Sequence, residues 1–253
     1  MSTGNSAERL QASREAAAKT KGFQRITALF DEGTFNEVDS FAKSGDGSAE
    51  VVAGYGEVDG CPVYAFVQNS DVDGGAMSKA QAAKIKKIYD LAVKTGSPVV
   101  GIYDSIGGRL NPGADMLAAY GEILLGNNNL SGVVPQISLV LGPCLGTSAM
   151  IAASADIVVM TEKAQLTIDT TGKDGAADDA AKLGICHVVA KDDKEAMEQV
   201  RKLLAVLPSN NLAGAPVFES SDSAEAALAA GADAKKVVEA ISDKGSFVEL
   251  NSA

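Results

Sequence analysis

Three short glycine loops carry the residues best suited to chemistry in this sequence. They read Asp71-Val-Asp-Gly-Gly-Ala76, Asp104-Ser-Ile-Gly-Gly-Arg109 and Gly142-Pro-Cys-Leu-Gly-Thr-Ser148, and each follows an expected strand and precedes an expected helix. Glycine lets the backbone approach a ligand closely, and N–H groups at a helix start attract negative charge. Two such N–H groups aimed at one point would form an oxyanion hole. One loop alone would be an ordinary turn, but three in succession favour an anion or oxyanion site.

The sequence lacks the side chains that several other reactions need. Its only histidine is His187, and its three cysteines, Cys61, Cys144 and Cys186, are far apart, so no Cys/His zinc cluster can be built and no metal is expected. Cys144 precedes a glycine loop, but a buried thiol acting as a small apolar group is the favoured interpretation. For His187, we expect a structural role in which a backbone carbonyl binds the ring.

Composition and charge exclude several classes of protein. The 253 residues are 46% hydrophobic and 22% charged, which is typical of a globular protein. With 33 acidic and 22 basic side chains, the net charge is -11, which disfavours binding to nucleic acid or anionic membranes. The N-terminus lacks an apolar signal core, and no stretch reaches the roughly 18 apolar residues of a membrane span. These features, with scattered thiols, predict a cytoplasmic protein, which partners could attach to a membrane complex.

Alternating strands and helices position the three loops. An N-terminal helical segment is expected over residues 1–30, with an amphipathic helix at 7–30. Two strands, Val51–Val58 and Pro62–Val67, flank an Asp-Gly hairpin signal. This pattern predicts an α/β fold with a largely buried sheet. Its later elements are helix Lys79–Thr95, strand Val99–Tyr103, helix Ala114–Leu125, strand Ile137–Leu141, helix Ser148–Ser154, strand Ile157–Met160, a helix at 173–189 and helix Lys194–Leu207.

One segment occurs twice. Asp31-Glu-Gly-Thr-Phe-Asn-Glu-Val38 recurs as Asp243-Lys-Gly-Ser-Phe-Val-Glu-Leu250, and each copy follows an expected helix. The repeat is either a coincidence or the start of a second copy of the same architecture. Residues 212–232 are rich in Ala, Gly, Pro and Ser, so 212–253 is interpreted as a linker and C-terminal docking arm that leads into a missing second half.

Several motifs resemble the carboxyltransferase component of biotin-dependent acyl-CoA carboxylases and decarboxylases. They include Val72-Asp-Gly-Gly75, Tyr120-Gly-Glu-Ile123, Ser131-Gly-Val-Val-Pro-Gln-Ile-Ser138 and Gly142-Pro-Cys144. The likeness is to the N-terminal half of the propionyl-CoA carboxylase β type and covers roughly residues 22–211. It implies a crotonase-like (ClpP/crotonase) fold of stacked ββα units. It also implies that a carboxyl group moves between carboxybiotin and the α-carbon of an acyl-CoA, while backbone N–H groups hold the enolate oxygen.

The resemblance also implies roles for individual residues. Gly146 and Thr147 would supply the catalytic oxyanion hole, although the Thr147 side chain narrows the site and Ile106 intrudes on the neighbouring loop. Five lysines of the expected helix at 79–95 either form a solvated face or bind the phosphates of CoA. The substrate- and CoA-binding residues would be Gly74, Gly75, Ala76, Ser105, Ile106, Gly107, Gly108, Lys84 and Lys87.

Cofactor and partners are implied in the same way. None of the six methionines precedes a lysine, so the Met-Lys biotin-attachment pattern is missing and biotin would arrive on a separate biotin carboxyl carrier protein. A second carboxyltransferase subunit would carry the C-terminal half, with Phe247 of this chain as the anchor, and a biotin carboxylase or a membrane decarboxylase subunit could complete the hetero-oligomer. The acyl group and the direction of the reaction stay open.

Three rival functions were weighed. A hydratase or isomerase of the same superfamily would need two glutamates where Met150 and Thr170 stand, so it is rejected. A Clp-type serine protease would use Ser148 with His187. A non-catalytic scaffold subunit would keep the fold but would no longer bind CoA.

Overall fold

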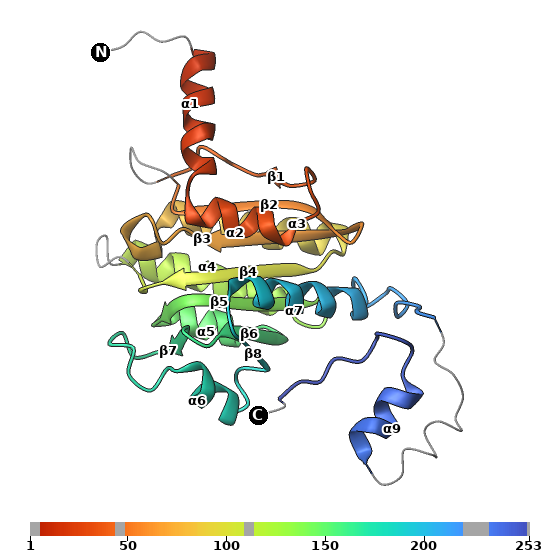
Figure 1. The fold of residues 1–253 in the computed structure, drawn as a ribbon. Coiled ribbons are helices and arrows are strands. Elements are labelled where there is room, and N and C mark those ends of the chain that lie inside the picture. The colour runs from red at the N-terminus through yellow and green to blue at the C-terminus, as the bar shows by residue number, and fades with distance from the viewer. Residues whose placement is uncertain (1–5, 44–48, 109–113, 220–232, 252–253) are drawn as a thin grey trace.

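The computed structural model describes residues 6–43, 49–108, 114–219 and 233–251, which include a three-layer α/β unit (Figure 1). Within these residues, eight strands form one sheet in the order β1-β2-β3-β4-β5-β6-β8, and β7 pairs with β5. The first three strands are antiparallel, and all later pairs are parallel. The strands are β1 (Asn36–Glu37), β2 (Val51–Val58), β3 (Cys61–Gln68), β4 (Val99–Ser105), β5 (Gln136–Leu145), β6 (Ile157–Thr161), β7 (Gln165–Thr167) and β8 (Val188–Ala190).

Helices cover both faces of the sheet, as the predicted α/β fold requires. One hydrophobic core contains Ile85 and Ile123, and the other contains Ile26 and Val200. The first core lies under α3, α4, α5 and α6, and the second lies under α2 and α7, which share one face in Figure 1. The helices are α1 (Ser6–Ala18), α2 (Lys21–Leu29), α3 (Lys79–Thr95), α4 (Ala114–Leu130), α5 (Thr147–Ala153), α6 (Ala177–Lys182), α7 (Asp193–Val206) and α9 (Ala234–Ile241).

The single helix expected at 7–30 is wrong, because the chain breaks into α1 and α2 at Thr20. Thr20 has extended dihedrals (φ −74°, ψ 147°), and its hydroxyl accepts a hydrogen bond from the Phe23 N–H. A threonine in this role begins a new helix. Figure 1 shows α1 projecting from the body, whereas α2 lies flat on the sheet.

The helix expected at 173–189 is also wrong. Only Ala177–Lys182 is helical, and Gly184 then takes a left-handed conformation (φ 73°) that ends the segment. The following residues form β8, which joins the sheet beside β6. β8 has only three residues, which is too few to show the alternation of buried and exposed side chains that marks a strand. Its pairing with β6 therefore decides its structure.

Two other elements extend beyond their expected ends. α4 continues from Leu125 to Leu130, where the Asn127 side chain donates to Gln136 Oε1 (2.9 Å) and Leu130 is fully buried. β5 continues past Leu141 through the third glycine loop to Leu145. Tertiary contacts therefore stabilise residues that local propensity would end.

The repeated segment adopts the same turn in both places. Thr34 donates to the Asp31 carbonyl from its N–H (3.1 Å) and from its hydroxyl (2.8 Å). Ser246 donates to the Asp243 carbonyl in the same two ways, at 3.0 Å and 2.8 Å. The glycine in each turn has a positive φ, 77° in the first copy and 80° in the second. The sequence repeat is thus a structural repeat, each copy following a helix. Of the expected linker, residues 220–232 lie outside the described part of the chain.

Candidate functional site

The three glycine loops meet at the carboxyl ends of β3, β4 and β5. The Ile106 N–H donates to the Gly74 carbonyl (3.1 Å), and the Met77 N–H donates to the Gly107 carbonyl (2.8 Å). A Cβ added to Gly107 would lie 3.7 Å from the Leu145 carbonyl oxygen of the third loop. The structure therefore brings together the residues that the sequence placed in three separate segments.

Glycine is required where the first two loops touch. Gly75 has φ +72°, and a Cβ there would lie 2.0 Å from the Asp104 carbonyl oxygen. Gly74 has φ +61° and faces the Ile106 side chain, which a Cβ would approach to 3.0 Å. These glycines therefore let the two loops pack against one another, and Ile106 remains 55% exposed beside them.

Most of the expected N–H donors already have acceptors. The Gly146 N–H donates to the Thr167 carbonyl of β7 (3.0 Å), and the Gly107 N–H donates to Ser105 Oγ (3.2 Å). Gly146 thus donates within the fold in this structure, and the oxyanion role expected of Gly146 and Thr147 stays a prediction. Thr147 is the first residue of α5, where N–H groups have no acceptor within the helix.

The lysines expected to bind CoA phosphates lie elsewhere. The Lys84 side chain is 1% exposed, and its ammonium donates to the Val51 carbonyl (3.0 Å) and lies 3.9 Å from Glu37. Burial lowers the pKa of Lys84 and raises the pKa of Glu37. Lys87 is half exposed and donates to Asp39 (2.8 Å). The structure removes Lys84 from the candidate site, and both ammonium groups contact the region of β1 and β2 rather than the glycine loops.

Cys144, Ser148 and His187 do not form a nucleophilic centre. Cys144 is fully buried, and this burial raises the pKa of its thiol. The Ser148 hydroxyl is buried, and its hydrogen bond with the Tyr120 hydroxyl opposes the rise that burial causes in the pKa of Tyr120. His187 Nδ1 instead accepts from the Val158 N–H (3.0 Å), so this histidine is structural, with a backbone N–H rather than the expected carbonyl as its partner. These contacts do not support a Ser148–His187 hydrolase.

The sequence interpretation missed Arg25 and the role of Asp104. The carboxylate of Asp104 is 7% exposed and accepts from Arg25 Nη1 (2.5 Å) and from Ser70 Oγ (2.8 Å). Arg25 precedes Ile26 and lies four residues before Leu29, so it belongs to the buried stripe of α2. A charge within an apolar stripe was the available signal, since buried charges need partners.

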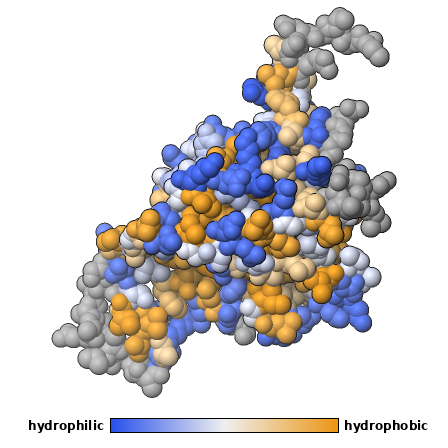
Figure 2. All heavy atoms as spheres, turned by 180° about the vertical axis from the view of Figure 1, so that it is seen from behind, coloured by the Kyte–Doolittle hydropathy of each residue, from blue (hydrophilic) through white to orange (hydrophobic). Residues whose placement is uncertain are grey.

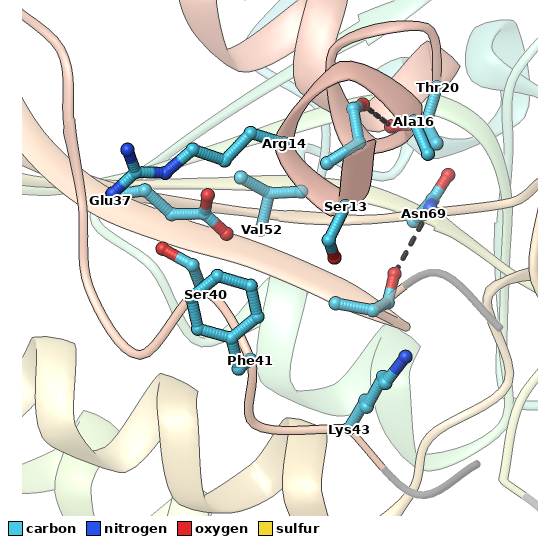
Figure 3. Close-up of a pocket in the computed structure, with 12 residues that line it drawn as sticks. Ser13, Arg14, Ala16, Thr20, Glu37, Ser40, Phe41, Lys43, Val52 and Asn69 are labelled. Carbon is cyan, nitrogen blue, oxygen red and sulfur yellow. Dashed lines mark hydrogen bonds between the residues drawn. The ribbon is translucent and has the colours of Figure 1, made fainter. Parts of the chain in front are cut away.

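A pocket of about 330 Å³ lies between α1 and the segment that follows β1 (Figure 3). Its lining includes Arg14, Glu37, Phe41 and Asn69, which Figure 3 shows around the opening. Asn69 links the pocket to the first glycine loop, because its Oδ1 accepts from the Asp71 N–H (3.3 Å).

Apolar side chains are exposed on the face that carries α3, α4 and α5. Figure 2 shows this rear face, with apolar atoms gathered over its lower part. The exposed residues include Leu117 (77%) and Leu125 of α4, Met150 of α5 and Ile168 (71%) after β7.

In the described ranges no group of three His, Cys, Asp or Glu side chains could hold a metal ion. None of the helices described is both long and apolar enough to span a bilayer.

Comparisons with known proteins point to one family. A carboxyl transferase domain model matches residues 14–253. The methylmalonyl-CoA decarboxylase subunit alpha of Veillonella parvula is 37% identical in an alignment of 237 positions, gaps included, that covers 83% of this chain and 46% of that protein. The propionyl-CoA carboxylase beta chain of Saccharopolyspora erythraea is 35% identical in an alignment of 292 positions, gaps included, that covers 97% of this chain and 53% of the relative.

A solved structure gives the same result. The transcarboxylase 12S crystal structure with methylmalonyl-coenzyme A and methylmalonic acid bound has a TM-score of 0.83 and 30% identity, over 96% of this chain and 54% of the other. This likeness confirms the expected crotonase-like fold. The chain spans about half the length of these relatives.

Proposed function

Because the chain belongs to the carboxyl transferase domain family, we propose that it moves a carboxyl group between carboxybiotin and the α-carbon of an acyl-CoA. The observation that carries this proposal is the meeting of the three glycine loops at one edge of the sheet. Such a site would position a thioester and stabilise negative charge on its oxygen without a side-chain base.

Each loop has a part in this proposal. The loops containing Gly74–Ala76 and Ser105–Gly108 would hold the acyl-CoA, and their mutual hydrogen bonds fix the shape of that surface. The Thr147 N–H would donate to the enolate oxygen. Biotin would supply the carried carboxyl group, and it would come on a separate carrier protein because no methionine of this chain precedes a lysine.

A second carboxyltransferase unit would complete the site. The apolar face of α9 supports this part of the proposal, since Val238 is 40% exposed and Ile241 is 63% exposed. In the repeat, these positions correspond to Ile26 and Leu29 of α2, which are fully buried against the sheet. We expect α9 to be covered by a similar sheet, contributed by residues outside this sequence, on the same polypeptide or on a separate subunit.

The segment after α9 has a different role from the one expected. Val248 packs against the core beneath α2 and α7, and the Asn251 N–H donates to the His187 carbonyl (2.9 Å). The idea that this segment packs wholly on a partner, with Phe247 as anchor, is therefore wrong for Val248 and Asn251. The arm proposed for docking is reduced to α9.

The remaining partners are proposed from the relatives. Both a decarboxylase subunit and a carboxylase chain are similar to this protein at 37% and 35% identity, so neither direction is favoured. We propose a hetero-oligomer with a biotin carboxyl carrier protein and either a biotin carboxylase or a membrane decarboxylase subunit. This chain would work in the cytoplasm, attached to a membrane only through such a partner.

Carboxyl transfer can be measured directly. The protein is incubated with carboxylated biotin carrier and either acetyl-CoA or propionyl-CoA, with and without the second unit. We expect a carboxylated CoA ester to form only when both units are present, together with saturable binding of the acyl-CoA. An assembled complex that binds no CoA ester would support the scaffold function instead. Full transfer by the chain alone would contradict the two-unit site.

A further inference from the structure

Arg25 of α2 joins three elements beneath the glycine loops. Its side chain is 7% exposed and donates from Nη1 to Asp104 (2.5 Å) and from Nε to Asp193 (2.8 Å). Its Nη2 donates to the Leu141 carbonyl (3.2 Å). The end of β4, the start of α7 and β5 just before the third loop are therefore bound to one guanidinium. A lysine could not reproduce this, since only arginine presents several donors in a fixed plane.

Asp104 extends these contacts to the other loops. It also accepts from Ser70 Oγ (2.8 Å) and from Lys21 Nζ (3.4 Å). Ser70 leads into the first glycine loop, where Asp71 accepts from the Lys21 N–H (2.7 Å). A Cβ on Gly142 would lie 2.3 Å from Asp104 Oδ1, so the carboxylate touches the backbone of the third loop. All three loops thus contact Asp104 or its immediate partners.

Stability alone gives no reason for this pair. A buried ion pair must overcome the cost of removing two charges from water, and well-packed apolar residues are often as stabilising. Its specific contribution is geometric, because the planar guanidinium and the carboxylate fix distances among chain segments far apart in sequence.

We propose that Arg25 and Asp104 are positioning residues that hold the three glycine loops in register, so that the Thr147 N–H faces the acyl-CoA held by the other two loops. This inference rests on the proposed function of the same site. Arg25 lies on α2 and Asp104 begins the second loop, and neither side chain is among the residues proposed to hold the acyl-CoA.

Arg201 of α7 provides a matched control. It donates to the Leu29 carbonyl (2.9 Å) and to the carboxylates of Asp31 (2.8 Å) and Asp59 (2.5 Å). It therefore joins α7 to the end of α2 through one carbonyl, and to Asp31 and the β2–β3 turn through two carboxylates. Its loss should weaken the same pair of helices without disturbing the glycine loops.

The test compares Arg25→Met, Arg25→Lys, Asp104→Asn and Arg201→Met in the full protein by amide hydrogen exchange. We expect Arg25→Met and Asp104→Asn to speed exchange at least tenfold in peptides covering residues 71–77, 104–108 and 142–148. Arg25→Lys should give an intermediate effect. Arg201→Met should speed exchange near residues 29–34 and 57–60 only. If loop protection in Arg25→Met equals that of the parent, or if Arg201→Met loosens the loops equally, the positioning role is overturned.

Kinetics separate this inference from the proposed function. In the assembled complex, Arg25→Met should lower kcat for carboxyl transfer at least tenfold more than Arg201→Met, with a smaller change in KM for acyl-CoA. If Arg25→Met does not fold, Ser70→Ala replaces it in the test, because this variant keeps the charges of Arg25 and Asp104. It should speed amide hydrogen exchange in the loops about threefold. An unchanged rate in Ser70→Ala would count against the inference. An assembled parent complex without transfer activity would contradict the proposed function, whereas the hydrogen-exchange measurements would still test the positioning role of Arg25 and Asp104.

Discussion

Gly142 of β5 lies directly against the carboxylate of Asp104 of β4. The two strands pair regularly up to Tyr103 and Val140, and their register then shifts before Ser105 pairs with Cys144. The additional residues on β5 form an irregularity that brings Gly142 to the carboxylate. A side chain at position 142 would occupy the space that Asp104 needs to reach Arg25.

Substitution of Gly142 by alanine should therefore destabilise the protein. The added Cβ would clash with Asp104, which Arg25 and Ser70 hold in place, and overpacking of this kind costs about 1–3 kcal/mol. Urea denaturation measures the change. Gly121→Ala is the control, since nothing lies within 4 Å of its Cβ on α4 and alanine should stabilise that helix by about 0.5–1 kcal/mol. Equal stability of Gly142→Ala and the parent would contradict the close contact.

Thr147→Pro tests the oxyanion donor. Proline is well tolerated at the first position of a helix, which Thr147 occupies in α5, so the fold should persist while one N–H is lost. Carboxyl transfer by the complex should fall roughly 10²–10³-fold. Thr147→Gly keeps the N–H and should preserve or raise the rate. A proline variant that turns over within about twofold of the parent would remove Thr147 from the mechanism.

The three thiols should differ in reactivity. Cys61 is exposed at the start of β3, whereas Cys144 and Cys186 are buried and burial raises the pKa of both thiols. Because the thiolate is the reactive form, an aromatic disulfide reagent should label one thiol quickly in the folded protein and three after denaturation. Cys61→Ser should abolish the fast phase. Rapid labelling of Cys144 in that variant would show that its loop opens.

Alkaline pH should destabilise the fold through Tyr89. Burial raises the pKa of Tyr89 to about 12, above its usual value of 10.0, although hydrogen bonds to Asn127 and Tyr103 oppose the shift. The unfolded chain therefore ionises first at this residue, so the contribution of Tyr89 to stability is complete below pH 10 and is lost as the pH rises toward 12. The loss should be about 2–3 kcal/mol. Tyr89→Phe should reduce this pH dependence of the unfolding free energy but not remove it, because burial also raises the pKa of Tyr103 and of Tyr120. An unchanged pH dependence in Tyr89→Phe would contradict the role of Tyr89.

Local signals explain which elements could be predicted from the sequence. α3 was predicted from Lys79 to Thr95 and has these bounds, because the Ser78 side chain caps its first turn and Gly96 ends it with φ 67°. β7 was not predicted. It has three residues and exists through its pairing with β5, so no periodic pattern marks it. The pairing also supplies the Thr167 carbonyl that accepts from the Gly146 N–H, a contact that the sequence does not reveal.

The candidate site shows the same division. Its glycine loops were predicted because glycine, which lacks a Cβ, allows the backbones of two chain segments to approach closely. Lys84 was assigned to CoA because its helix is rich in lysine, without regard to the face of the helix on which it lies. That face is buried, and it also carries Gln81, Ile85 and Ile88. Arg25 was missed for the same reason, because it lies on the buried face of α2. The partner that accepts from Lys84 is 33 residues away and those of Arg25 are 79 or more residues away, and a single sequence does not display such contacts.

The contacts between α2 and α7 also govern when this unit can fold. Arg25 meets Asp193 and Arg201 meets the Leu29 carbonyl across 168 and 172 residues of chain. At synthesis rates of about 5–20 residues per second, α2 leaves the ribosome roughly 10–30 s before its partner helix exists. During that interval its apolar stripe must be shielded by nascent sheet or by a chaperone. Docking of α2 against α7 therefore waits for the synthesis of α7, and the long separation in sequence adds to the contact order that slows folding.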